Sequence, residues 1–429
     1  MFRYLAGPGL RRPRVSAVCG IAALFGVLGP VPSPGAPALT LRQAVTLAVA
    51  RAPQVQAARA RQDAATADFD RAGRWPDPRL SFGIQNLAIS GPGAFSPAGD
   101  PMTMRTIELS QAIPSGASLD ASLAGARAAT AGADAGMAQA RLDTRQAAAS
   151  SWVAAWASEQ ELQQLVRLRR QDDLAIRTAK ARLAGGTGSV ADVLAAEAAA
   201  AELANRIDRA DAAVASARAT LARWVGSPAA QRPLDHAPDF SRLPVTAARL
   251  LQGTEAQAPL QAWTARVDRA EAALQAARAS REPDWSVALG YGARAPGLPR
   301  MATLVVGLRL PLFAAHREDQ DVLARRADLD AIRAERENAR RAQVAAVQRA
   351  LAAWEADGRT VRRDRSTLLH LASDRSAVAL AAYRGGAPLQ SWLDARRDEI
   401  AVRLDYVAQL ARWGERWSEL AYLLPGDAR

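Results

Sequence analysis

The chain has 429 residues, of which 55 are Lys or Arg and 43 are Asp or Glu, so its formal net charge is +12. Its only cysteine is Cys19, which excludes an intramolecular disulfide and a site built from several thiolates. So basic a chain could bind nucleic acid, but its arginines are spread among Asp and Glu along predicted helices. That distribution is typical of solvated helix faces and argues against nucleic-acid binding.

The first 38 residues have the order of a secretory signal. Four arginines without any acid precede an apolar run over 15–28, and the small residues Ala36-Pro37-Ala38 follow. This order predicts a signal peptide over 1–38, cleaved after Ala38. Two alternatives stay open. One is a membrane anchor, although the apolar run is short for a membrane span. The other is lipidation at Cys19, although a lipidated cysteine normally follows the apolar run and most of this run comes after Cys19.

The stretch over 116–226 predicts two helices joined by a tight turn. It contains no proline and is rich in Ala, Glu, Gln, Arg and Leu, which favour helix. Its one break, over 183–189, is glycine-rich and suits a helix end followed by a new N-cap. We expect helices over about 116–183 and 189–226, the second with an apolar heptad typical of a coiled coil. At the usual rise the first helix is on the order of 100 Å long and needs other helices beside it.

The segments before this helix change period. A helix is expected over 39–74, kinked or broken at Pro53. Over 80–85 apolar and polar residues then alternate, and a loop rich in Gly and Pro separates this segment from a second one over 102–113. Alternation with period two predicts two β-strands.

The second half of the chain repeats this plan about 200 residues later, which indicates a duplicated domain. It predicts a helix over 246–282 containing Pro259, strands at 285–292 and 303–310, a long helix over 315–384, a turn at Gly385-Gly386-Ala387-Pro388, and a helix over 388–424. The expected boundaries are a first repeat at 39–228, a linker at 229–245 and a second repeat at 246–426.

The four predicted strands are each near the length of about 10 residues that crosses a bilayer in a tilted barrel. Four strands cannot close a barrel, and open strand edges are not tolerated in lipid. If these strands span a membrane, several copies of the chain must contribute to one barrel. The fold class expected is therefore an α+β membrane protein with a long helical coiled-coil barrel and an internal duplication.

This duplicated order of helix, two strands, long helix, glycine turn and helix resembles the outer-membrane efflux (TolC-like) family. The resemblance implies a homotrimer in which four strands per protomer form one shared twelve-stranded β-barrel in outer-membrane lipid, above a helical tunnel in the periplasm. It implies a passive duct for a periplasmic adaptor and an inner-membrane RND-type pump, with no enzymatic activity and no cofactor. Two alternatives stay open: the outer-membrane duct of a type I protein-secretion system, and a periplasmic coiled-coil adaptor.

The resemblance also assigns roles near the two glycine turns. The turn residues Gly185, Gly186, Gly188, Gly385, Gly386 and Pro388 would form the tips that dock the adaptor. Asp192 and Asp394 match positions where the family carries acids that narrow the periplasmic mouth, and Ser391 stands where a second acid is common. A ring of carboxylates at such a mouth selects for cations. The competing interpretation is that both acids only complement the dipole of their own helix.

Residues 86–91 and 100–105 resemble the heavy-metal cation branch of the family. Met102, Met104 and Met301 would lie at the extracellular strand ends, and thioethers suit soft Cu(I) or Ag(I). Methionines that simply fill gaps at a barrel rim are the more ordinary interpretation. The three histidines, His236, His316 and His370, are isolated, and the sequence contains neither H-E-x-x-H nor C-x-x-C. The sequence therefore offers no catalytic motif.

Overall fold

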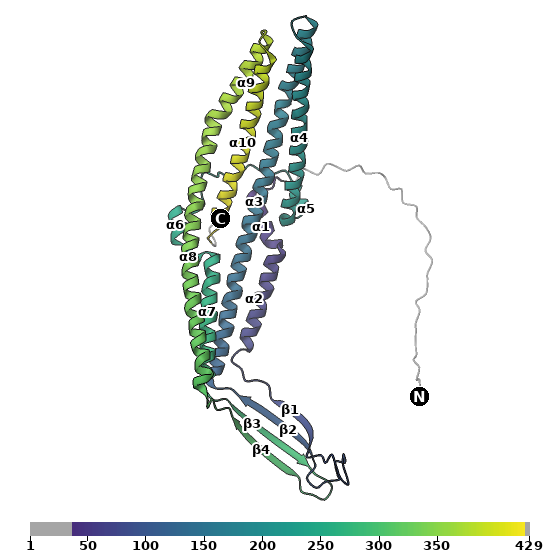
Figure 1. Cartoon of the computed structure of the whole chain (residues 1–429), viewed down its shortest axis with the longest axis vertical. Coiled ribbons are helices and arrows are strands. Elements are labelled where there is room, and N and C mark those ends of the chain that lie inside the picture. Colours follow the sequence, from purple (N-terminus) through teal and green to yellow (C-terminus); the bar gives the residue numbers. More distant parts are fainter. Residues whose placement is uncertain (1–36, 425–429) are drawn as a thin grey trace, which may run out of the picture. The chain divides into compact units, whose positions relative to one another are not determined.

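The computed structural model of the chain describes residues 37–424 (Figure 1). The predicted signal peptide therefore lies outside the described residues, apart from Pro37 and Ala38, and so does Cys19. Within the described part, no helix combines the length and the apolar character needed to cross a membrane.

The helices of the first half lie close to the predicted ranges, with the break expected at Pro53 and with one short helix, α5, that was not predicted. They are α1 (Leu41–Arg51), α2 (Pro53–Arg71), α3 (Gly116–Ala184), α4 (Val190–Val225) and the short α5 (Ser227–Ala230). Thr40 caps α1 in a capping box with Gln43. Pro53 does not sit within a kinked helix: it is the first residue of α2, where its missing N–H costs nothing.

The second half contains α6 (Ala247–Gln252), α7 (Ala258–Ala279), α8 (Glu318–Arg363), α9 (Leu369–Arg384) and α10 (Leu389–Ala421). The single helix predicted over 246–282 is wrong at its start, because α6 ends at Gln252 with Gly253 as its C-cap, and a 3-10 turn precedes α7. A side chain at Gly253 would lie 2.9 Å from Leu424, so the backbone passes close to that residue. The helix predicted over 315–384 begins later, at Glu318, and contains a π-helical turn at Asp364–Leu368 between α8 and α9.

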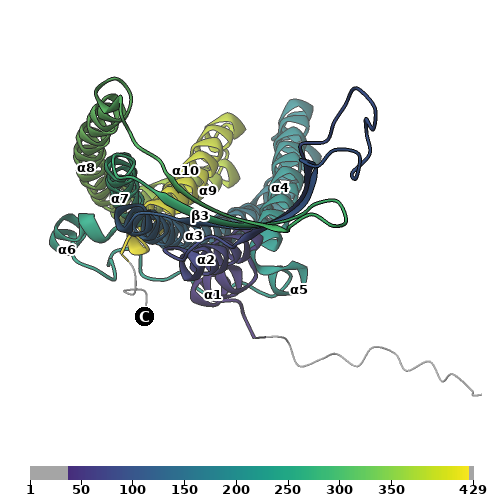
Figure 2. The ribbon, with the colours of Figure 1, turned by 90° about the horizontal axis from the view of Figure 1, so that it is seen from below.

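The long helix α3 is the element on which the others pack. It contacts α1, α2, α4, α7 and α10. Beside it, α1 and α2 occupy the half nearer the sheet, and α4 occupies the other half (Figure 1). Seen along the helices, α8, α10, α3 and α4 form one curved layer, with α1, α5 and α6 outside it (Figure 2). Two shorter helices stacked end to end thus accompany one long neighbour.

The largest buried cluster lies around the junction of α1 with α3 and α10, and aromatic rings form its centre. The ring of Phe240, from the segment between the repeats, lies 6.0 Å from that of Trp413 and 5.8 Å from that of Trp417. The fully buried Trp152 donates a hydrogen bond of 2.9 Å from its indole nitrogen to the carbonyl of Leu39. The segment between the repeats is thus part of the core. Its Leu234 also pairs with Leu39, just before α1, in an isolated parallel β-bridge.

The sheet consists of β1 (Arg79–Gln85), β2 (Met104–Ile113), β3 (Trp285–Ala293) and β4 (Met301–Leu308), all antiparallel and in that order. Each half contributes one hairpin, and β2 pairs with β3 across the two halves. Asp284, just before β3, accepts a 2.9 Å hydrogen bond from the Ser115 amide at the start of α3 and forms a 2.7 Å ion pair with Arg309. This carboxylate fastens the end of the sheet to the helices.

Candidate functional site

One face of the sheet is almost entirely apolar. Cross-strand neighbours share a face, and the register places Leu80, Leu109, Leu289 and Leu304 in one row. The next row contains Phe82, Ile107, Tyr291 and Ala302. The opposite face carries mostly small or polar residues, namely Ser81, Gly83, Thr106, Glu108, Ser110, Ser286, Ala288, Gly290 and Thr303.

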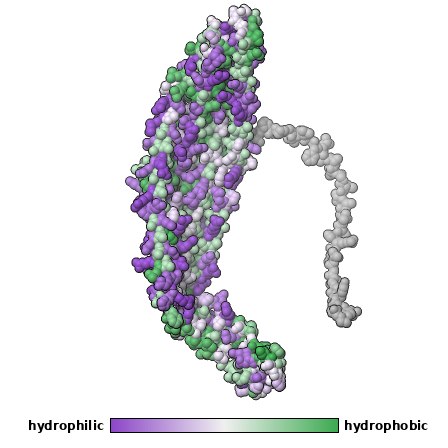
Figure 3. All heavy atoms as spheres, in the orientation of Figure 1, coloured by the Kyte–Doolittle hydropathy of each residue, from purple (hydrophilic) through white to green (hydrophobic). Residues whose placement is uncertain are grey.

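Nothing in residues 37–424 covers the apolar face. The Phe82 side chain is 71% exposed and Leu304 is 68% exposed. Figure 3 shows apolar surface over the sheet, whereas most of the helical surface in that view is hydrophilic. In the described chain β1 and β4 are edge strands, with unpaired backbone groups. An exposed apolar face of this extent with two open edges is typical of a surface that a membrane or another protein chain covers.

The two glycine turns lie at the end of the helices remote from the sheet (Figure 1). At each turn the first glycine ends the helix with negative φ and the second has positive φ: +70° at Gly186 and +109° at Gly386. Gly188 is needed for space instead, because a side chain there would lie 2.9 Å from Arg182. Pro388 occupies the N-cap of α10. These turns have the tight reversal that the sequence predicted.

Arg182 of α3 joins the two turns. Its guanidinium donates to the carbonyl oxygens of Tyr383, at 2.8 Å, and Ala387, at 3.2 Å, both beside the second turn. It also lies 4.7 Å from the centre of the Tyr383 ring. The sequence did not indicate this contact, because Arg182 is one of many arginines and its partners lie about two hundred positions away.

The two aspartates singled out by the resemblance have local partners. Asp192 completes a capping box with Ser189, since its carboxylate accepts from the Ser189 amide at 3.3 Å. The Asp394 carboxylate accepts a 2.8 Å hydrogen bond from the Gln390 side chain and lies 3.8 Å from Arg397. Asp394 and Ser391 are exposed, whereas Asp192 is half-buried. Asp192 thus has a helix-capping role in the structure, whereas Asp394 is a solvated carboxylate one turn into α10.

A buried network of charges connects α3 with α10. The Arg396 guanidinium lies 2.8 Å from the Asp172 carboxylate and 3.2 Å from that of Glu399, which also binds Arg403 at 2.7 Å. Burial raises the pKa of the Asp172 carboxyl, an effect that the neighbouring Arg396 opposes without cancelling. This network, which sequence reasoning missed, links the two repeats below their turns.

The three methionines lie at the end of the sheet remote from the helices. Met104 and Met301 are the first residues of β2 and β4, and Met102 lies in the loop before β2 with 59% of its surface exposed. The Met104 sulfur packs beside Gly292, where a side chain would approach it to 3.1 Å. Within residues 37–424, His, Cys, Asp and Glu side chains form no group of three or more placed to hold a metal ion.

Comparison with known proteins agrees with this geometry. Residues 44–227 match the family model described as outer membrane efflux protein. No curated protein matches this sequence. The fold is that of TolC-like outer membrane channels, mostly helical with a small antiparallel sheet and an internal duplication. The first half of the chain is thus similar in sequence to this family, and the described chain has the fold of these channels.

Three solved structures are similar over nearly their whole length. A membrane protein from Pseudomonas aeruginosa has a TM-score of 0.76 and 18% identity, covering 91% of this chain and 91% of that one. The outer membrane protein VceC from Vibrio cholerae has a TM-score of 0.73 and 17% identity, and the match covers 90% of this chain and 96% of that one. CusC, described in terms of transmembrane channel formation, has a TM-score of 0.75 and 18% identity, and the match covers 90% of this chain and 92% of that one.

Proposed function

We propose that this chain is the protomer of a passive outer-membrane channel-tunnel in a tripartite efflux system. The observation that carries the proposal is the exposed apolar face of the sheet, with strands of 7 to 10 residues and an edge strand on each side. Strands of this length suit the hydrocarbon thickness, and the mostly small and polar second face suits the lumen of a barrel. The similarity to VceC and CusC supports the outer membrane as the location.

The open edges support an oligomer, and the family resemblance supports three copies. Pairing β4 of one copy with β1 of the next removes both edges, and three copies give the twelve strands that the family resemblance implies. The curved layer of α8, α10, α3 and α4 would close with its copies into a helical tunnel (Figure 2). The tunnel would extend into the periplasm, away from the sheet.

The turn ends are the proposed docking surface for the adaptor and, through it, for the RND-type pump. Gly185, Gly186, Gly188, Gly385, Gly386 and Pro388 form this end, and Arg182 holds its two halves together. The chain would act as a duct that needs the pump for its driving force. A protein-secretion duct shares these features and is the second candidate, while the duplicated halves and the apolar sheet disfavour a coiled-coil adaptor.

A heavy-metal cargo is the finer part of this proposal. It is supported by the sequence resemblance of residues 86–91 and 100–105 and by the methionines at one end of the sheet. Two strains should be compared for growth in Cu(I), Ag(I) and a dye substrate. One lacks the gene, and the other expresses the triple variant in which Met102, Met104 and Met301 are changed to Leu. Loss of metal resistance alone supports a metal role for these side chains, and equal growth assigns them to packing.

The experiment for the main proposal is fractionation of cells that express the full chain. The mature protein should sediment with outer membranes and migrate as a trimer in mild detergent. Deleting the gene should raise sensitivity to at least one toxic compound, and the intact gene should restore growth. A monomer recovered in the soluble periplasmic fraction would overturn the proposal.

A further inference from the structure

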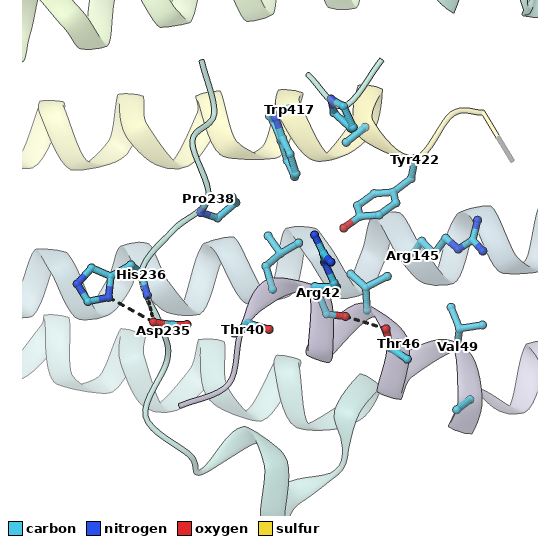
Figure 4. A pocket seen from close by; sticks show the side chains of 15 residues that line it. Thr40, Arg42, Thr46, Val49, Arg145, Asp235, His236, Pro238, Trp417 and Tyr422 are labelled. Carbon is cyan, nitrogen blue, oxygen red and sulfur yellow. Dashed lines mark hydrogen bonds and ion pairs between the residues drawn. The ribbon is translucent and has the colours of Figure 1, made fainter. Parts of the chain in front are cut away.

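A cavity of about 790 Å³ lies on the helical part of the molecule, between α1, the end of α10 and the segment between the repeats (Figure 4). Residues from both ends of the described chain meet there, together with Arg145 of α3. Its volume falls in the range of pockets that hold small organic ligands. It lies apart from the sheet and from the glycine turns, so the channel function does not account for it.

The floor of this pocket is apolar and firmly supported. Val45 and Val49 line it from α1, and Trp417 and Ala421 line it from α10. Val45, Trp417 and Ala421 belong to the largest buried cluster, so this floor does not have to reorganise to form. The Trp417 indole is fixed by a 2.7 Å hydrogen bond from its nitrogen to the Arg242 carbonyl. The floor is thus preorganised for an apolar group.

The rim of the pocket carries two arginines and one acid. Arg42 and Arg145 both line it, and neither side chain has a hydrogen-bond or ion-pair partner among residues 37–424. The Tyr422 hydroxyl points toward Arg42 (Figure 4). Burial raises the pKa of Tyr422 to about 12, so this hydroxyl stays protonated and able to donate. Asp235, the acid on the lining, is already bound to His236 through its carboxylate.

We propose that this pocket binds a small amphiphile with one carboxylate head group. The head would lie between Arg42, Arg145 and the Tyr422 hydroxyl, where it would receive charge-assisted hydrogen bonds. The hydrocarbon part would cover Val45, Val49 and Trp417 and remove their surface from water. A simple inorganic anion would leave that floor unused, and a neutral hydrocarbon would leave the two arginines unpaired.

The source of this ligand is a free single-chain acid and not a bilayer lipid. The pocket opens beside α1, and the 19 residues of α2 separate α1 from the sheet. At the rise of an α-helix this distance is roughly 28 Å. Under the proposed function the sheet lies in the membrane, so a lipid anchored around it could not place its head group in the pocket.

The test is isothermal titration of the full chain in lipid nanodiscs with octanoate, with empty nanodiscs as the blank. We expect saturable binding of one octanoate per chain above the blank, and at least tenfold weaker binding of 1-octanol and octyltrimethylammonium. The double variant Arg42→Gln, Arg145→Gln should bind octanoate at least tenfold more weakly. The matched control is Arg59→Gln, Arg61→Gln, which removes the same charge from exposed positions of α2 and should bind like wild type.

Filling the floor with Val49→Trp should abolish binding while leaving the thermal unfolding temperature close to wild type. Equal affinity for octanoate and 1-octanol, or no saturation with any probe, would overturn the proposal. A variant that ends at Leu424 tests whether the C-terminal residues of the chain occupy the pocket. If octanoate binds only after residues 425–429 are removed, the chain's own end is the occupant and the proposal is wrong. Binding requires neither pump nor adaptor, so its failure is distinguishable from failure of the channel function.

Discussion

Arg396 of α10 and Asp172 of α3 form an ion pair with an N–O distance of 2.8 Å, and their side chains are 3% and 4% exposed. The pair joins the second repeat to the first, far from the large aromatic cluster. Removing both charges from water is costly, and the geometry compensates with further bonds: Arg396 also donates to Gln171 at 2.8 Å and to Glu399 at 3.2 Å. The two helices can separate here only if buried charges lose their partners.

We therefore expect Arg396→Met to destabilise the helical part strongly. It leaves the Asp172 carboxylate buried without a cation, which typically costs roughly 3–5 kcal/mol. The measurement is thermal or chemical unfolding of the purified protein. The double variant Asp172→Leu, Arg396→Met should recover most of the loss, because a buried pair replaced by apolar residues is often neutral or better. A double variant as unstable as the single one would contradict this account.

The same pair predicts a pH dependence. Burial raises the folded-state pKa of Asp172 above its ordinary value of 3.8, so the folded chain holds this proton more readily than the unfolded chain. The ionised carboxylate therefore costs stability above its folded-state pKa, and the cost fades as the pH falls toward 3.8. In Arg396→Met the cost grows, so the loss in unfolding temperature should be larger at pH 8 than at pH 5. An equal loss at both pH values would remove Asp172 as its cause.

Local patterns predicted the elements well, because helix ends and strands depend on neighbouring residues. The turn at Gly185-Gly186 and the alternation over 80–85 are of this kind. The break at Gly253 was missed although its signals are local: Gly253 is the C-cap of α6, and Pro259 lies in the first turn of α7. The Arg182 and Arg396 contacts and the pocket beside Trp417 were missed because the residues that form them lie far apart along the chain. Each brings together residues from both halves, and no spacing in the sequence marks which arginine will find a distant partner.

Valine at both Gly186 and Gly386 should abolish efflux while the trimer still inserts. These residues have φ of +70° and +109°, where a β-branched side chain is strained by roughly 1–3 kcal/mol and alters the tip surface. The measurement is drug or metal susceptibility alongside trimer content of outer membranes. The control is Gly185→Ala, Gly385→Ala, because both of these residues have negative φ and room for a methyl group. Unchanged resistance in the valine variant would count against adaptor docking at these tips.

Closure of the sheet between copies can be tested by cysteine crosslinking, because the chain has no cysteine after Cys19. Cysteines at Ser81 of β1 and Thr303 of β4 lie on the same face of opposite edge strands, so they are far apart within one copy. If β4 pairs with β1 of the next copy, oxidation should give covalent dimers and trimers on denaturing gels, with Gly83 as the alternative β1 position. Cysteines at the paired residues Glu108 and Gly290 should crosslink only within one chain. Crosslinks that never join two copies would contradict a shared barrel.

The last prediction concerns Asp394 and the proposed periplasmic gate. Its carboxylate is exposed one turn beyond the second glycine turn, and it is not needed to cap its helix, since Pro388 occupies the N-cap. In a trimer three copies would form a ring, and like charges brought close together favour a bound cation.

Divalent cations added from the periplasmic side should therefore block single-channel conductance in a planar bilayer, and Asp394→Asn should relieve that block with the trimer intact. Ser391 supplies no second carboxylate, so block of wild type should need more cation than in a Ser391→Asp variant. Asp192→Asn is the matched control: Asp192 completes the capping box with Ser189, so this change should alter helix stability slightly and leave the block unchanged. Equal block of wild type and of Asp394→Asn would show that Asp394 is not part of the gate. Relief of the block by Asp192→Asn alone would assign the carboxylate ring to Asp192, beside the first glycine turn.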